Sequence, residues 1–191
     1  MRKFLAVMHR RVSLFHGVAL ALAALLCGAQ IAPASSIESA YSRHDYERCQ
    51  KISDDDPIME RRCVGHAGIP VTWVNEPDSS SVSFGTEGAV GGEFDKRFTF
   101  AVAGNVIEWR GPVERGKVAP YAAIVRYQLC RGIGGPCAPE LAVYRLNGQR
   151  SSCIAATVNG RRTDANVQAR VMADSFARTF DCEKDKVRIL E

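Results

Sequence analysis

Apolar and polar residues alternate through the middle of the chain, which is the pattern of half-buried β-strands. The alternation covers Ser81–Phe84 and continues from Arg97 to Val102, while Val71–Val74 and Ile107–Trp109 are shorter β-prone runs. Successive side chains of a strand point to opposite faces of its sheet, so a period of two predicts one buried face. Tyr121–Leu129 is apolar at nearly every position and therefore predicts a central strand.

Residues that tolerate a positive φ separate several of these runs. Such residues are typical of the tight turns that join antiparallel strands, because two-residue hairpin turns need positive φ. The two expected hairpins pair Phe98–Val102 with Val106–Arg110 across Gly104-Asn105, and Leu141–Leu146 with Ser152–Val158 across a loop that contains Asn147-Gly148. The middle of the chain therefore predicts a mainly antiparallel sheet.

The hydrophobic period changes near the C-terminus. From Ala165 onward, apolar residues recur at steps of three and four, which places them on one face of a helix. This face consists of Ala169, Met172, Ala173, Phe176, Ala177 and Phe180. Thr163 or Asp164 is expected to cap the first turn, and Asp174 is expected to pair with Arg178. The chain thus predicts an α+β fold: a single domain with a mainly antiparallel sheet and a C-terminal helix packed on it.

The first 34 residues have the layout of a secretory signal. Residues 1–17 contain basic residues and no acidic residue, and an apolar stretch follows from Val18 to Ala32. Ala32-Pro33-Ala34 then provides the small residues of a cleavage site. A retained membrane anchor is the alternative, but the apolar stretch is shorter than the roughly 20 residues that a spanning helix needs. We therefore expect residues 1–34 to be cleaved and residues 35–191 to form the mature domain.

Removal of this signal changes the net charge. The whole chain has 25 Lys and Arg against 21 Asp and Glu, which gives a formal net charge of +4. Four of the basic residues and none of the acidic ones lie in residues 1–34, so residues 35–191 have no net charge. Proteins bind nucleic acids and anionic membranes through uncompensated Lys and Arg. Neither is therefore an expected partner of the mature domain.

The cysteine count fits an exported protein. Of seven cysteines in the chain, only Cys27 precedes residue 35, and Leu26 beside it makes this segment unlike a lipoprotein signal. An even number of cysteines in an exported domain indicates disulfides. Proximity along the chain selects the first two pairs and leaves the third, so the expected pairs are Cys49–Cys63, Cys130–Cys137 and Cys153–Cys182.

Cys130 and Cys137 flank a glycine-rich loop, and two other interpretations of this pair fit poorly. A thioredoxin-type redox pair is C-x-x-C at the start of a helix, whereas these cysteines are farther apart and enclose Gly and Pro. A zinc site usually needs four ligands with closely spaced cysteines, and neither His44 nor His66 has that spacing. A disulfide that fastens a reversal between two strands fits the spacing best.

Candidate catalytic groups are few. His44 and His66 are the only histidines after residue 34, and a hydrolytic triad needs a base of this type. These histidines and the run Asp54–Asp56 could gather around a divalent ion. Calcium loops space their acids at alternate positions, however, whereas these three are consecutive and precede Pro57. The run is therefore interpreted as a solvated loop, and no catalytic residue, metal site or cofactor is assigned.

Two segments resemble a recurrent pattern in small exported bacterial proteins. They are DANVQARVMADSFARTFDC, residues 164–182, and RCVGHAGIPV, residues 62–71. The proteins that share this pattern carry paired cysteines and have no assigned activity. The resemblance therefore implies no catalytic or binding residue.

Two classes of function follow from these observations. The favoured one is a non-enzymatic periplasmic or secreted interaction or binding module of unknown ligand, with a protein or an envelope component as its partner. The alternative is a hydrolase or metal-dependent enzyme that uses His44, His66 and the Asp54–Asp56 run. The two classes differ in whether these groups converge in one cleft.

Export is expected to remove residues 1–34, because a signal peptidase cleaves after small residues that follow a short apolar stretch. N-terminal sequencing of the exported protein should find Ser35 at or near the first position. A chain that still begins at Met1, or one acylated at Cys27, would contradict this interpretation.

Overall fold

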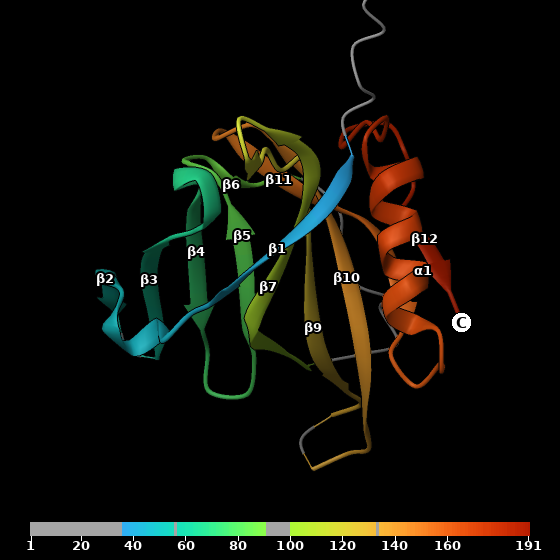
Figure 1. Ribbon diagram of the computed structural model, residues 1–191. Helices are drawn as coiled ribbons and strands as arrows, with labels where there is room; N and C mark the ends of the chain where they lie inside the picture. The colour runs from blue at the N-terminus through green and yellow to red at the C-terminus, as the bar shows by residue number, and fades with distance from the viewer. Residues whose placement is uncertain (1–35, 56, 91–99, 133) are drawn as a thin grey trace, which may run out of the picture. The chain divides into compact units, whose positions relative to one another are not determined.

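Two β-sheets and a C-terminal helix form the part of the chain that the computed structural model describes, residues 36–191 except 56, 91–99 and 133 (Figure 1). The expected signal segment, residues 1–34, lies outside the described residues, as do the first residues of the expected strand Phe98–Val102. The described residues have the predicted α+β fold of a single domain, with mainly antiparallel sheets and three disulfides.

The larger sheet has the strand order β1-β7-β9-β10-β11-β12, as far as the chain is described. Neighbours in this order are antiparallel except β11 and β12, which are parallel, and the short strands β6 and β8 pair with β11 and β7. Its strands are β1 (Ile37–Arg43), β6 (Gly88–Ala89), β7 (Phe100–Glu114), β8 (Lys117–Val118), β9 (Ala122–Cys130), β10 (Cys137–Asn147), β11 (Ser151–Asn159) and β12 (Arg188–Leu190).

The smaller sheet is an antiparallel meander, and the helical segments lie outside both sheets. Its strands are β2 (Gln50–Asp55), β3 (Ile58–Val64), β4 (Pro70–Asn75) and β5 (Ser80–Phe84). The helical segments are the 3₁₀ turns η2 (Tyr46–Arg48) and η3 (His66–Gly68), the helix α1 (Ala165–Met172) and the π-helical turn η4 (Ala173–Ala177) that continues it.

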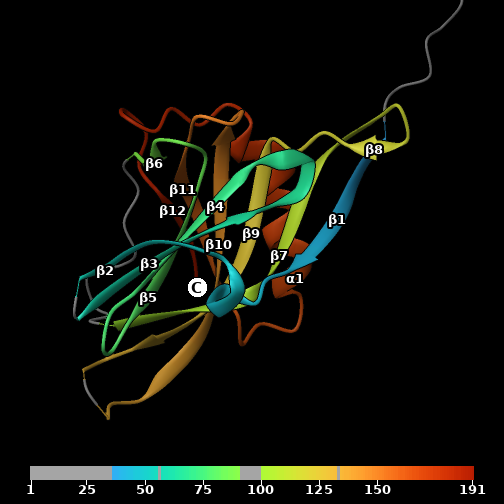
Figure 2. The ribbon, with the colours of Figure 1, turned by 90° about the vertical axis from the view of Figure 1, so that its left-hand side faces the viewer.

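The larger sheet lies between the smaller sheet and the helix, and it carries a hydrophobic core on each face (Figures 1 and 2). Strand β9 contributes to both cores: Val125 and Tyr127 pack toward the smaller sheet, whereas Ala122 and Ile124 pack toward α1. Its neighbours are β7 and β10, so the predicted central strand is confirmed. The predicted hairpin between β10 and β11 is also confirmed, with Asn147 opposite Ser151.

The expected apolar face of α1 and η4 is the face that packs on the sheet. Its buried side chains are Ala165, Ala169, Met172, Ala173, Ala177 and Phe180. Asp164 stands at the N-cap position as expected, but its side chain makes no capping bond. Its carboxylate instead accepts hydrogen bonds from Arg162 and Gln168, so the predicted capping bond is wrong.

Asp174 binds the sheet rather than its own helix. The guanidinium of Arg110 on β7 donates to both of its carboxylate oxygens, and Tyr121 donates to one of them at 3.0 Å. Arg178, the expected partner of Asp174, instead lies over the ring of Tyr121. A bidentate salt bridge to a largely buried arginine is stronger than an exposed salt bridge between two residues of the same helix. The predicted Asp174–Arg178 pair is therefore wrong, and Asp174 anchors η4 to β7.

The prediction of a turn at Gly104-Asn105 is wrong as well. Both residues lie within the single strand β7, which continues past them with a bulge. Ala103 pairs with Tyr127 and Ile107 pairs with Val125, so three residues of β7 bulge opposite Arg126 alone. Residues that suit turns also suit bulges. A Cβ at Gly104 would lie 2.8 Å from the carbonyl oxygen of Arg126, which is why the bulge needs glycine there.

The edge of β5 is joined to the larger sheet by buried hydroxyl groups. The backbone N–H of Val82 donates to Tyr127 Oη at 3.1 Å, and that of Phe84 donates to Ser152 Oγ at 2.9 Å. In the opposite direction, the N–H of Ala103 donates to Ser80 Oγ at 2.9 Å. A buried backbone N–H without a partner is costly, so these bonds allow the two sheets to meet without leaving the edge of β5 unsatisfied.

The three disulfides are Cys49–Cys63, Cys130–Cys137 and Cys153–Cys182, the same pairs that the spacing selected. Cys49–Cys63 ties the segment before β2 to β3. Cys130–Cys137 joins register partners on β9 and β10 and closes the glycine-rich reversal between them.

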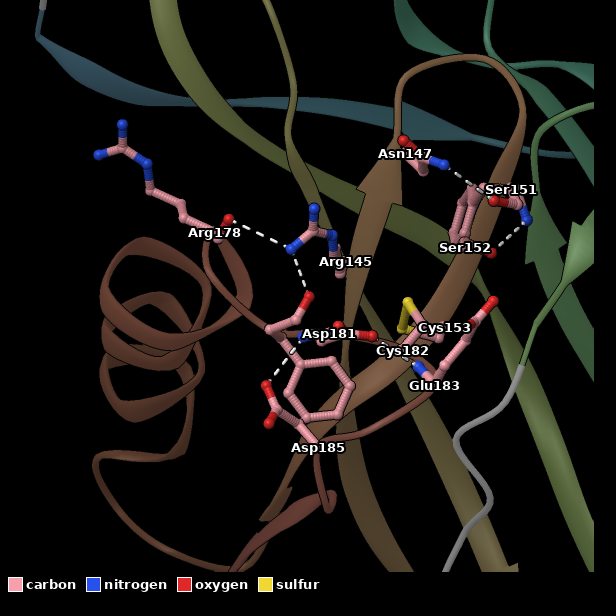
Figure 3. The surroundings of a disulfide bond; sticks show 12 residues. Arg145, Asn147, Ser151, Ser152, Cys153, Arg178, Asp181, Cys182, Glu183 and Asp185 are labelled. Atoms are coloured by element: carbon pink, nitrogen blue, oxygen red, sulfur yellow. Dashed lines mark hydrogen bonds between the residues drawn. A yellow bond between two sulfur atoms is a disulfide. The ribbon is translucent and has the colours of Figure 1, made fainter.

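Cys153–Cys182 fastens the chain after η4 to β11 (Figure 3). Beside this disulfide, Arg145 of β10 donates hydrogen bonds to the backbone carbonyl oxygens of Arg178 and Phe180. The last carbonyls of a helical segment have no partner within it, and a cation is favourable there. A covalent and an electrostatic contact therefore hold the same end of the helix against the sheet.

Ser152→Ala should lower the free energy of unfolding by about 1–3 kcal/mol, because it leaves the buried N–H of Phe84 without an acceptor. Urea unfolding followed by tryptophan fluorescence would measure the change. The matched control is Ser151→Ala, since Ser151 Oγ accepts only a long 3.4 Å bond from Asn147 and no backbone N–H in the described structure. Equal losses in the two variants would contradict the role given to Ser152.

Candidate functional site

His44 lies just after β1, on the face of the larger sheet that meets the smaller one. Trp109 Nε1 donates to Ser42 Oγ at 2.8 Å, and the same oxygen lies 2.8 Å from His44 Nε2. Ser42 Oγ has two lone pairs and one O–H, so it can donate to His44 Nε2 or accept from it, depending on the tautomer of the ring. Burial lowers the pKa of His44 and so favours the neutral imidazole.

A serine beside a histidine is also the start of a hydrolytic triad, but this pair lacks the rest of one. Across the described residues, no carboxylate bonds the second ring nitrogen of His44. The His44 side chain is buried, and its ring stacks 5.8 Å from that of Tyr46, which in turn stacks on Trp73. The arrangement is that of a packed aromatic cluster that holds β1 to the smaller sheet.

His66 has a separate structural role in η3. Its Nε2 donates to the carbonyl oxygen of Val118 at 2.8 Å, and its ring lies 6.2 Å from that of Trp109. It thereby fastens the turn between β3 and β4 to the short strand β8. Each histidine thus makes a structural hydrogen bond in its own place, and His44 also lines an open pocket of about 560 Å³ together with Tyr46 and Trp73.

The acidic run of the alternative hypothesis lies at the end of β2. Asp54 and Asp55 pair with Met59 and Ile58, whereas Asp56 and the side chains of the other two lie outside the described residues. In the described ranges, no group of three or more His, Cys, Asp and Glu is arranged to hold a metal ion. The alternative enzyme therefore gains no assembled site from this structure.

A groove of about 470 Å³ crosses the opposite face of the larger sheet, beside α1. We call it the helix-side groove. Its floor includes Val102 and Val106 of β7, Ile124 of β9 and Leu141 of β10. Val102 and Val106 are 45% and 39% exposed, so the floor presents apolar side chains to solvent. A concave, mostly apolar surface with a few polar groups is the usual form of a binding site.

The bulge in β7 shapes this groove. Gly104 and Asn105 both line it, and their carbonyl oxygens already accept bonds from Tyr46 Oη at 3.3 Å and from the N–H of His44 at 2.8 Å. These two acceptors are therefore directed to the segment after β1 rather than to a ligand. The Gly104-Asn105 pair that indicated a turn in the sequence instead forms one side of the groove.

One end of the groove is bridged by an ion pair. Arg170 of α1 donates to Glu108 of β7 at 2.6 and 3.3 Å and to Tyr41 of β1 at 3.0 Å. Ser39 also donates to Glu108, at 2.5 Å. The hydrogen bond to Glu108 is the main reason that the pKa of Arg170 is raised. The ion pair with Glu108 and the hydrogen bond to Tyr41 tie α1, β7 and β1 together at this end.

Arg126 of β9 is a second charged residue that lines the groove. Its Nη2 donates to Asn166 Oδ1 of α1 at 3.1 Å. No carboxylate in the described part of the chain forms an ion pair with it. A guanidinium has five N–H donors, so Arg126 keeps donors and a full positive charge for a ligand in the groove.

Sequence reasoning did not foresee this groove. Tyr121–Leu129 was expected to be a central strand, which is confirmed, but the exposure of Arg126 and Gln128, which line the groove, was not predicted. The available signal was the presence of Arg126 in an otherwise apolar central strand. Asn166 and Arg170 carried no signal, since polar residues are ordinary on the outer side of an amphipathic helix.

Comparison of the chain with protein-family models, curated proteins and solved structures found no match. Function is therefore argued from this structure and from the sequence alone. Among the described residues, none of the helices is long and apolar enough to cross a membrane.

Protein stability should fall as the pH is lowered through and below 6.5, the ordinary pKa of histidine, in part because of His44. Its native pKa is lowered, so the unfolded chain takes up a proton before the native protein does. The contribution of neutral His44 is complete above that pH and is lost as the pH falls toward the native pKa.

The measurement is urea unfolding at a series of pH values for the wild type and for His44→Gln. Glutamine can accept from Ser42 but does not titrate, so the variant should lose less stability on acidification. Identical pH dependence in the two proteins would show that His44 is not the group responsible.

Proposed function

We propose that this protein is a non-enzymatic periplasmic or secreted binding module, and that the helix-side groove is its binding surface. The observation that carries the proposal is the pair of exposed apolar side chains on the groove floor, Val102 and Val106, which lie beside the buried Ile124 and Leu141. Exposed apolar residues gathered in a concave surface mark binding sites more often than singly scattered ones do.

The histidines support a binding role over a catalytic one. His44 and His66 each make a hydrogen bond that holds backbone segments together, to Ser42 and to the Val118 carbonyl. Both lie near Trp109, on the face of the larger sheet that meets the smaller sheet, whereas the groove is on the opposite face. A catalytic set would need a base directed at a reacting group in the cleft.

The compartment is supported by the disulfides. Cys49–Cys63, Cys130–Cys137 and Cys153–Cys182 form within the described domain, and such bonds persist in oxidising compartments outside the cytosol. The signal-like layout of residues 1–34 supports the same compartment. The near-zero net charge after residue 34 argues against binding a polyanion.

Val106→Asp should abolish binding through the groove, because an apolar ligand would then have to cover an unpaired charge. The experiment incubates the immobilised protein with an envelope extract and identifies bound proteins and small molecules by mass spectrometry. The matched control is Val64→Asp on β3, since Val64 is 80% exposed and belongs to the other sheet.

A molecule that binds the wild type and Val64→Asp but not Val106→Asp would support the proposal. Molecules that bind all three proteins equally would exclude the groove as the binding surface. Both substitutions are at exposed positions, so unfolding should not account for a difference between them, and circular dichroism spectra would check this.

A further inference from the structure

The ligand of the helix-side groove can be inferred from the charges around it. Glu108 and Arg170 are paired at one end and cancel. Arg126 lines the groove, and among the described residues its side chain bonds only the neutral amide of Asn166. The polar groups of the groove therefore sum to one positive charge, which is complementary to a ligand with one negative charge.

The length of the groove follows from the register of its strands. Val102 lies opposite Gln128, and Glu108 lies opposite Ile124, so these two pairs mark its ends. The bridge from Tyr41 through Arg170 to Glu108 spans the second end. Arg126 lies between these two ends, opposite the bulge in β7, so a ligand bound by its charged end at Arg126 can extend toward Val102.

The floor favours an acyl chain over a peptide. A bound peptide brings N–H and C=O groups that need partners, and burying them unpaired is costly. The bulge carbonyls of Gly104 and Asn105 are already engaged with Tyr46 and His44. An acyl chain has no such groups, and it gains free energy from each methylene that it buries against the exposed side chains of Val102 and Val106.

We propose that the helix-side groove binds a free long-chain carboxylate, with the acyl chain over Val102 and Val106 and the carboxylate on the guanidinium of Arg126. This inference rests on the proposed binding function and adds the chemical class of the ligand. A volume of about 470 Å³ is within the range of small-molecule sites. Arginine suits the head group because its planar donors match the two oxygens of a carboxylate.

The test is isothermal titration calorimetry of the full protein at neutral pH with three probes of equal chain length: dodecanoate, dodecanol and dodecyltrimethylammonium. Dodecanoate should bind at one site per protein. The neutral alcohol should bind at least about tenfold more weakly, since its single uncharged oxygen cannot form the bidentate, charge-assisted pair with Arg126. The cation should bind more weakly still, because it would be repelled by Arg126.

Substitutions of Arg126 test whether dodecanoate binds in the groove and whether its binding depends on the positive charge there. Arg126→Gln should weaken dodecanoate binding about tenfold or more and leave dodecanol binding unchanged, while Arg126→Lys should restore part of the loss by keeping the charge. The matched control is Arg115→Gln, which removes one exposed positive charge at the turn between β7 and β8 and should leave the affinity unchanged.

Three outcomes would overturn the inference: equal affinity for the three probes, equal loss in Arg126→Gln and Arg115→Gln, or dodecanoate binding that Val106→Asp leaves intact. Binding only to vesicles that contain the same carboxylate, and not to the free compound, would also overturn it and identify a membrane as the source. If dodecanoate fails to bind while an envelope molecule still requires Val106, the ligand class is wrong and the binding function stands. If neither binds, both are wrong.

Discussion

The structure depends on the way in which the edge of β5 meets the larger sheet. A strand edge carries unpaired N–H groups, and burying it without acceptors would cost more than the adjacent core returns. Tyr127 and Ser152 supply hydroxyl acceptors for Val82 and Phe84, so the smaller sheet can pack face against face with the larger one. Val82, Phe84 and Tyr127 belong to the core that encloses Trp109, so these hydrogen bonds lie within that core.

The opposite face of the larger sheet is held by different forces. Small residues such as Ala169 and Ala173 bring the helix close to β10 and β11, and contacts of Asp174, Arg145 and Cys182 fix its C-terminal half. These anchors hold the helix on one side of the sheet. The helix-side groove lies beside it, where Val102 and Val106 of β7 and the polar residues Arg126 and Gln128 of β9 stay exposed.

The groove and the aromatic cluster around His44 are connected through the same three residues of β7. The bulge at Gly104–Val106 turns two carbonyl oxygens toward His44 and Tyr46 on one side, and it places Val106 in the groove on the other. The structural role of His44 and the binding role proposed for the groove are therefore consistent with each other. A change that flattens the bulge would disturb both faces of the sheet.

The sequence by itself determined the class of elements, the central strand, the hairpin at Asn147-Gly148, the apolar face of the helix and the disulfide pairs. Each of these depends on local periodicity or on spacing along the chain. The tertiary structure alone decided that Gly104-Asn105 forms a bulge, that Asp174 binds Arg110 and that Arg126 faces a groove. A glycine-asparagine pair suits a turn and a bulge equally well, and a carboxylate pairs with whichever cation the fold brings nearest. Those choices depend on strands that are distant in sequence, so no local pattern could make them.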